Sequence, residues 1–182
     1  MNRDNQQERV LTPEYLAGFI DGEGCFSVTV HPHNSARWGW LIDPDFTVNQ
    51  HKKSLEFLER IQKFFGCGKI YEKSPNKSNV LTYIIYSRRS IYEKVIPFID
   101  AHPLVSHKQH DYEKFREIIE SLMLKKHHTL EGFHEIVKIA FSMNAQGKQR
   151  KYTLQQVLEL SSETTRQASV SKTDEDIVRT QQ

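Results

Sequence analysis

The sequence contains very little cysteine and no long hydrophobic run. Two cysteines in 182 residues cannot form a disulfide scaffold, and they are typical of a protein in a reducing compartment. No apolar stretch approaches the roughly 20 residues of a membrane-spanning helix, and the polar beginning MNRDNQQER is unlike a signal peptide. We therefore expect an intracellular protein with no membrane partner, in which Cys25 and Cys67 are small buried hydrophobic residues.

A strong net charge is also absent. The 25 lysines and arginines nearly balance the 23 acidic residues, so a formal charge of +2 does not by itself indicate a nucleic-acid partner. Charged residues are nevertheless grouped along the chain. Basic runs lie at 50–53, 69–77, 87–89, 107–110 and 148–151, and acidic residues gather at 111–120 and beyond 163. This grouping is consistent with a surface polarised by charge.

Length and composition indicate one folded domain. A chain of 182 residues can bury a sizeable core but is short for two domains. Its hydrophobic fraction of 37% and mean hydropathy of -0.62 describe a protein with a generous polar surface. We place the domain at 11–162, with a flexible N-terminus at 1–10 and a polar, disordered tail at 163–182.

Hydrophobic periodicity predicts helices and strands in the order αββαββα, followed by further helices. Thr12 can cap a helix that begins at Pro13 and ends near Asp21, because Gly22 and Gly24 are helix-stopping residues. The sequence then predicts strands at 26–31, 40–49, 69–73 and 80–87 and helices at 55–65, 90–101, 108–124, 130–144 and 153–161. The pattern favours an α+β fold with a mostly antiparallel sheet covered by helices on one face.

One face of the predicted sheet is polar and basic. A solvated sheet face explains such a list, but hydroxyls, amides, imidazoles and cations also read base edges and phosphates. An antiparallel sheet or ribbon can lie in the major groove, so this face is a candidate DNA surface. Its residues are Ser27, Thr29, His31, His33, Asp43, Asp45, Thr47, Asn49, Lys69, Tyr71, Lys73, Thr82 and Tyr86, and we add Arg37, Lys53 and Ile84 as candidate contacts.

Two carboxylates stand where the first helix ends. Asp21 and Glu23 are flanked by Gly22 and Gly24. A helix C-terminus is already the negative end of the helix dipole and disfavours an anion by a few tenths up to about 1 kcal/mol. The arrangement makes sense if a cation binds there or if another part of the assembly compensates the charge.

The segment Leu16 to Gly24, LAGFIDGEG, resembles the LAGLIDADG motif of homing endonucleases. The resemblance covers about 15–161, because the motif opens an αββαββα pattern at a helix-to-strand junction. Only one motif is visible, and single-motif members of the family work as homodimers. The resemblance therefore implies an algal or organellar type of homodimeric meganuclease with a saddle-shaped sheet. It would reside in a chloroplast or mitochondrion if it is encoded in an intron there.

The resemblance also implies roles for the motif residues. In the family the motif helices pair across a two-fold axis, and here Ala17, Gly18, Asp21 and Gly22 match that dimer interface. Glu23 matches the metal-binding acid, with the Gly22 carbonyl as a second ligand, whereas Asp21 supports the helix end. The expected metal is Mg²⁺, with Mn²⁺ able to substitute and Ca²⁺ allowing binding without cleavage.

Further matches lie outside the motif. Gln50 matches a glutamine that orients the attacking water, and Lys108 matches a lysine near the scissile phosphate. A basic residue expected four positions beyond Gln50 is Ser54 here, which leaves that part of the solvent network in doubt. The basic residues Lys148, Arg150 and Lys151 match a loop that contacts the DNA backbone, although such a run can also be a solvated loop.

These observations predict a site-specific endonuclease that cuts double-stranded DNA at a long pseudo-palindromic site, leaves 3′ overhangs and initiates intron homing. Two alternatives remain open, namely an RNA-binding intron maturase and a DNA-binding regulator without catalysis. The presence of both motif acids argues against the regulator. A zinc site at His31 and His33 is disfavoured, because no other cysteine or histidine pair has the spacing to complete it.

Overall fold

The computed structural model describes residues 10–72, 79–143 and 150–163. The chain divides into two compact units, the first formed by 1–27 with 45–113 and the second by 28–44 with 114–182. Two predicted DNA contacts, Lys73 and Lys148, lie outside the described residues. So do the predicted terminal segments, apart from residues 10 and 163. Strands β1 and β2 and helix α5 contribute residues to both units.

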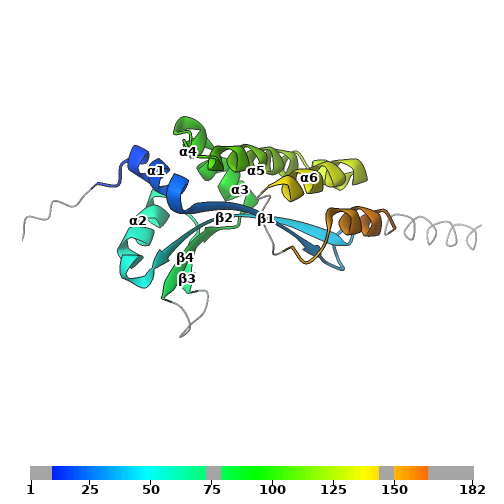
Figure 1. The fold of residues 1–182 in the computed structure, drawn as a ribbon, viewed down its shortest axis with the longest axis horizontal. Coiled ribbons are helices and arrows are strands. Elements are labelled where there is room, and N and C mark those ends of the chain that lie inside the picture. The colour runs from blue at the N-terminus through cyan, green and yellow to red at the C-terminus, as the bar shows by residue number, and fades with distance from the viewer. Residues whose placement is uncertain (1–9, 73–78, 144–149, 164–182) are drawn as a thin grey trace, which may run out of the picture. The chain divides into compact units, whose positions relative to one another are not determined.

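The order of elements confirms the predicted α+β fold (Figure 1). The sheet has the strand order β1-β2-β4-β3, and β4 pairs antiparallel with both of its neighbours. Residues 154–163 are also helical. The labelled elements are α1 (Pro13–Glu23), β1 (Gly24–Pro32), β2 (Trp40–His51), η1 (Lys52–Ser54), α2 (Leu55–Phe65), β3 (Lys69–Glu72), β4 (Val80–Ile85), α3 (Arg88–Ser90), η2 (Ile91–Val95), α4 (Ile96–Ala101), α5 (Lys108–Met123), η3 (Lys126–His128) and α6 (Leu130–Ser142).

Helix α1 begins as predicted but ends later. The Thr12 hydroxyl accepts a hydrogen bond from the backbone N–H of Tyr15 at 3.2 Å, and Pro13 occupies the first turn. The helix was expected to end near Asp21 and ends at Glu23, after which Gly24 begins β1. A Cβ at Gly24 would lie 2.7 Å from the carbonyl oxygen of Ile20, so the close approach there requires glycine.

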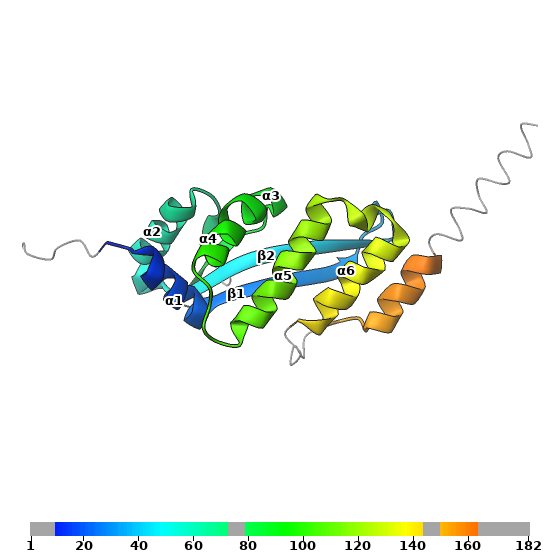
Figure 2. The same ribbon diagram turned by 90° about the horizontal axis from the view of Figure 1, so that it is seen from above.

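The first unit packs its helices against the inward face of the sheet. From above, α1, α2 and α4 gather at one end of β1 and β2 (Figure 2). The alternating residues Phe46 and Val48 on β2 are fully buried, as are Leu16 and Ile20 on α1. Each such side chain contributes about 1.5–3 kcal/mol of hydrophobic stabilisation. The predicted core face of β2 is therefore confirmed.

The helical segment from α3 to α4 contains a wide turn. The Ile96 N–H donates to the carbonyl of Ile91, five residues back, and Pro97 follows directly. Proline lacks an N–H and its ring clashes with the carbonyl four residues before it, which explains the local widening. The prediction of one helix over 90–101 is confirmed, with this irregular turn inside it.

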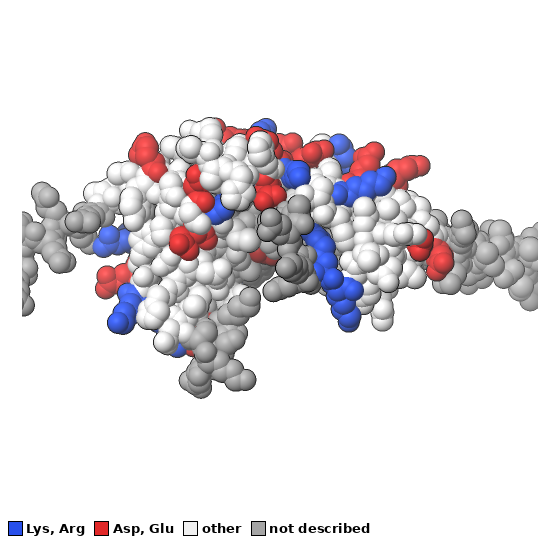
Figure 3. Space-filling view, in the orientation of Figure 1, with Lys and Arg blue, Asp and Glu red and all other residues white. Residues whose placement is uncertain are grey.

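The second unit contains the hairpin end of β1 and β2, the later part of α5, and α6. Gly39 adopts a positive φ of 74°, and its carbonyl accepts a hydrogen bond from the N–H of His33 at 2.8 Å, which closes the hairpin. Phe133, Ile136 and Val137 of α6 form much of the unit's buried core. Acidic side chains lie along α5 and α6 (Figure 3). None of the helices in the described part of the chain is long and apolar enough to cross a bilayer.

The prediction that both cysteines are buried is wrong. Cys25 is exposed and Cys67 is half-buried. Cys25 follows Gly24 and precedes Phe26, both buried, so strand alternation turns its side chain to the polar face of β1.

Candidate active site

The end of α1 is held by a lysine from the first turn of α5. The Lys108 Nζ donates to the carbonyl oxygens of Ile20 at 3.1 Å and of Gly22 at 3.2 Å. The Ile20 carbonyl also accepts the backbone N–H of Gly24. The Gly22 carbonyl lies beyond it in the last turn of α1, where helix geometry supplies no intrahelical donor. A positive charge therefore does sit at the negative helix end, and it comes from the protein itself.

Asp21 connects the same helix end to the loop before α5. Its carboxylate accepts hydrogen bonds from the backbone N–H groups of Val105 and Ser106, both at 3.0 Å, and from the Ser106 hydroxyl. The Ser106 hydroxyl oxygen also accepts from the backbone N–H of Lys108 at 3.2 Å. The carboxylate thus faces the positive N-terminal end of α5, which favours an anion.

The two charged groups of this junction have perturbed pKa values. Partial burial raises the pKa of Asp21, but the hydrogen bonds from Ser106 and Val105 and the charge of Lys108 outweigh it and leave the pKa below 3.8. Partial burial also lowers the pKa of Lys108, against the opposing effects of Asp21, Cys25 and Glu23. The cluster therefore favours an ionised Asp21.

Glu23 and the Gly22 carbonyl offer oxygen ligands next to one another. Glu23 is exposed at the end of α1, and the Gly22 carbonyl already bonds to a cationic group. Carboxylate and carbonyl oxygens suit a hard divalent cation such as Mg²⁺. Within the described ranges, no group of three or more His, Cys, Asp or Glu could hold a metal ion. These two residues therefore fit a metal site to which other molecules would add ligands.

The predicted water-orienting residue lies near the end of β2. Gln50 is half-buried and stands opposite Leu81 of β4 in the sheet register. In the adjoining η1, Lys52 forms an ion pair with Glu72 at 2.6 Å, whereas Lys53 is exposed. Of the two lysines that could replace the basic residue missing at Ser54, Lys53 is therefore the more accessible.

The polar sheet face in the first unit is partly bonded within itself. The Ser27 hydroxyl donates to Asp45 at 3.0 Å, and the Thr82 hydroxyl donates to the Asn49 side-chain oxygen at 2.6 Å. Thr82 is only 3% exposed, so its hydroxyl positions the Asn49 amide instead of facing solvent. Thr47 and Ile84 are half-buried, whereas Lys69 and Tyr71 are exposed.

The polar face of the second unit is centred on the hairpin. The His31 ring nitrogen Nε2 lies 2.7 Å from Asp43, and His33 bonds to the Ser35 hydroxyl. Thr29 is exposed. The Arg37 guanidinium lies 5.4 Å from the centre of the Trp38 ring, and the indole N–H donates to the His127 carbonyl at 2.9 Å. The hairpin tip is therefore anchored to η3.

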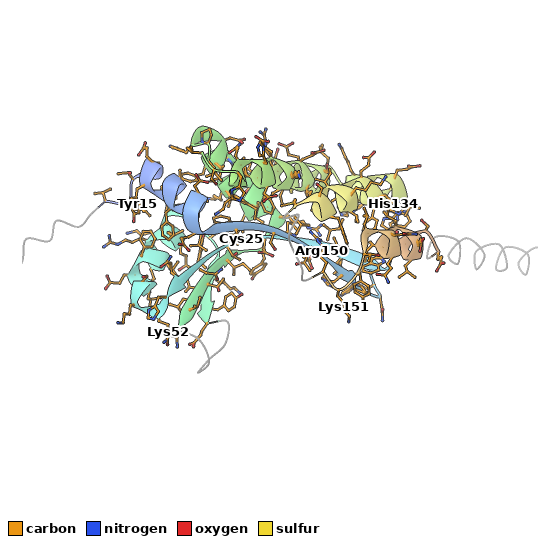
Figure 4. All side chains as sticks on the ribbon, viewed as in Figure 1. Tyr15, Cys25, Lys52, His134, Arg150 and Lys151 are labelled. Carbon is orange, nitrogen blue, oxygen red and sulfur yellow. The ribbon has the colours of Figure 1, made fainter. Side chains whose placement is uncertain are left out.

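Arg150 and Lys151 are neighbours in sequence with different surroundings (Figure 4). The Arg150 guanidinium lies 4.4 Å from the centre of the Phe141 ring and donates to the Ala140 carbonyl near the end of α6. Partial burial lowers the pKa of Arg150. Lys151 is exposed, and the next residue, Tyr152, packs edge-on against Trp40. Arg150 therefore secures this loop, and Lys151 is the basic group that the loop presents.

Sequence reasoning missed the residues that support these groups. The Ser106 hydroxyl bonds to Asp21, and the Arg37 guanidinium lies beside the Trp38 ring. Tyr152 packs against Trp40 and holds the loop at 150–152 in place. A serine two residues before the predicted helix start at 108 is a capping signal that could have identified Ser106. No pattern along the sequence indicates what Trp38 contacts.

The fold is that of the LAGLIDADG endonucleases. The sequence pattern of that family, described as LAGLIDADG endonuclease, matches residues 16–119, and the chain belongs to the family. The matched region begins in α1 and ends in α5, so it contains Asp21, Glu23, Gln50 and Lys108. The predicted family membership is confirmed.

Individual relatives are similar over most of the chain. Homing endonuclease I-ApeII from Aeropyrum pernix is 28% identical over 157 residues, or 84% of this chain and 92% of that protein. The archaeal intron-encoded homing endonuclease I-Vdi141I, solved in complex with DNA, has a TM-score of 0.77 and 29% identity over 84% of this chain and 96% of that one. I-SmaMI, bound to an uncleaved DNA target in the presence of calcium ions, has a TM-score of 0.71 and 34% identity over 75% of this chain and 46% of its own. Three longer relatives are matched over only 25%, 29% and 39% of their length.

Proposed function

We propose that this protein is a metal-dependent, site-specific endonuclease that cuts both strands of duplex DNA as a homodimer and initiates intron homing. The observation that carries the proposal is the α1 end, where Glu23 and the Gly22 carbonyl stand beside Lys108. The DNA complexes of I-Vdi141I and I-SmaMI support DNA as the substrate.

The chain's own residues divide the chemistry between them. Glu23 and the Gly22 carbonyl would hold Mg²⁺, which when bound polarises the scissile phosphate and lowers the pKa of the attacking water. Gln50 would orient that water from the end of β2. Lys108 would place a positive charge near the phosphate, where negative charge develops during hydrolysis. Breakage on both strands then leaves 3′ overhangs at a pseudo-palindromic site.

A second copy of the chain would complete the site. The Cβ positions of Gly18 and Gly22 face open space in the single chain, whereas Ala17 is 8% exposed and packs within its own chain. Glycines allow helices to approach closely, so the Gly18–Gly22 side of α1 is the surface on which we expect two motif helices to meet. The chain also spans 46% of the I-SmaMI chain, so two copies would correspond to that longer protein.

DNA binding is assigned to the polar sheet face and to the loop at 150–151. The exposed residues on these surfaces include three lysines, Lys53, Lys69 and Lys151, which supply positive charge. The exposed Asn49 supplies hydrogen-bonding groups. Phosphate contacts release condensed counterions, so we expect the binding constant to fall steeply with salt. A flat salt response would contradict an electrostatic DNA surface.

The test is a single selection on random duplex DNA. The purified protein captures its site in Ca²⁺, Mg²⁺ is then added, and the ends of the released fragments are sequenced. Cut ends with 3′ overhangs inside a near-palindromic consensus are the expected result. An enriched but intact consensus would indicate a DNA-binding regulator, and no enrichment would direct the search to intron RNA and a maturase.

The matched control removes only the proposed metal-binding charge. Glu23→Gln should enrich the same consensus in Ca²⁺ and fail to cut it in Mg²⁺, or in Mn²⁺ used as the alternative metal. Full cutting by this variant would remove Glu23 from the mechanism. Retained binding separates loss of chemistry from loss of folding.

A further inference from the structure

The Gly22 carbonyl has two competing uses. In the structure it accepts a hydrogen bond from Lys108 Nζ at 3.2 Å, and in the proposed active enzyme it is a ligand of Mg²⁺. A carbonyl oxygen has two lone pairs and can in principle serve both. However, an ammonium and a divalent cation on one oxygen would repel each other strongly, because they would lie only a few ångströms apart.

We propose that Lys108 is a built-in cation that holds the end of α1 in the metal-free protein and withdraws from the Gly22 carbonyl when a divalent cation binds. This inference rests on the proposed function, because it takes Gly22 and Glu23 as the metal ligands. It gives Lys108 a role before catalysis, separate from its contact with the scissile phosphate.

The surroundings of Lys108 allow its side chain to move while its backbone stays fixed. The backbone N–H of Lys108 is tied to the Ser106 hydroxyl, which also bonds to Asp21. The ammonium donates to the uncharged carbonyls of Ile20 and Gly22. A hydrogen bond to an uncharged acceptor is weaker than one within an ion pair, so this contact can be exchanged for another. The α1–α5 junction therefore remains when the ammonium leaves.

The ammonium also explains how two acids are tolerated at the helix end without metal. Asp21 and Glu23 both act electrostatically on Lys108, and each favours its charged form. One flexible lysine thus offsets a local excess of negative charge until a metal ion replaces it. Removing the lysine charge should have opposite effects on the metal-free protein and on metal affinity.

The variant that tests this is Lys108→Met, which keeps the length and apolar part of the side chain. In chelator we expect a lower melting temperature than wild type, because the α1 carbonyls lose their donor. In a Ca²⁺ titration followed by thermal unfolding, the midpoint should shift to lower concentration by roughly tenfold, because a competing positive charge is gone. Terbium luminescence with the same proteins provides a second measure of affinity.

Two controls make the result specific. Lys63→Met removes the same charge from an exposed position on α2 and should leave the Ca²⁺ midpoint unchanged. In wild type, the rate of Lys108 acetylation by a small reagent, read by mass spectrometry, should rise on adding Ca²⁺ because the ammonium is released. This second measurement keeps the test decisive if Lys108→Met folds poorly.

Each outcome decides a different statement. The proposed competition between Lys108 and the metal ion is overturned by an unchanged or weaker Ca²⁺ affinity in Lys108→Met. It is also overturned if the acetylation rate of Lys108 does not change with Ca²⁺. If Glu23→Gln binds Ca²⁺ as wild type does, or if wild type binds no metal, the ligand assignment itself fails. In that case the proposed metal site and this inference are both rejected.

Discussion

Asp21 is the residue on which the junction of α1 and α5 depends. Its carboxylate accepts two backbone hydrogen bonds and one hydroxyl hydrogen bond from a loop more than 80 positions away in sequence. Such bonds are strongest when the acceptor is charged. Asp21→Asn should therefore destabilise the fold by roughly 1–3 kcal/mol at neutral pH, as measured by urea unfolding.

The pH dependence identifies the charge as the cause. Because the folded-state pKa of Asp21 lies below 3.8, its contribution is fully present above that value and is lost as pH falls through the folded-state pKa. The stability difference between wild type and Asp21→Asn should therefore shrink in acid. Glu59→Gln, at an exposed position on α2, is the control and should show little difference at any pH. A pH-independent difference for Asp21→Asn would mean that packing, not charge, is responsible.

Elements were predictable from the sequence where the information is local. Thr12, Pro13 and the buried alternation of Phe46 and Val48 lie within a few residues of the features they define, and α1 and β2 form as expected. Helix α1 includes Gly22 and ends at Glu23, close to the expected end near Asp21. A local pattern could indicate Ser106 as a capping residue, but it cannot reveal that Ser106 also bonds to Asp21, since that contact joins distant segments.

The candidate site was predictable to a similar degree. The motif at 16–24 and the separate match at Lys108 name residues that the fold brings together, since Lys108 bonds to the Gly22 carbonyl beside Glu23. The catalytic roles given to Glu23 and Lys108 stay predictions. The orientation of individual side chains was not predictable. Strand alternation places Thr82 on the polar side of β4. Its side chain is nevertheless buried, and its hydroxyl bonds to Asn49 on the neighbouring strand.

The loop at 150–152 allows a test at the level of an element. Arg150→Met removes the contacts with Phe141 and the Ala140 carbonyl, so it should lower the melting temperature while leaving the salt dependence of DNA binding nearly unchanged. Lys151→Met should do the reverse, preserving stability and reducing the slope of log K against log salt by about 1. Equilibrium binding from low to moderate salt, with thermal unfolding of the free protein, measures both quantities.

The two variants control each other, since each removes one positive charge from adjacent positions. If Arg150→Met lowers the salt slope and keeps stability, Arg150 contacts a phosphate, as the basic run in the sequence predicts. Its contacts with Phe141 and the Ala140 carbonyl would then have to change on DNA. If neither slope changes, the loop lies outside the DNA surface.

At the scale of the whole molecule, activity should depend on two copies meeting through α1. Gly18→Leu adds a side chain where nothing lies within 4 Å in the single chain, so the isolated protomer should fold at least as stably, because leucine favours a helix by several tenths of a kcal/mol over glycine. The same side chain would prevent close approach of two motif helices, so sedimentation should show a monomer and cleavage should be lost. Lys138→Leu, at an exposed position on α6, adds a leucine elsewhere and should remain dimeric and active. A dimeric, active Gly18→Leu would place the dimer interface on another surface, and the carboxylates of Glu23 would then not meet at a shared axis.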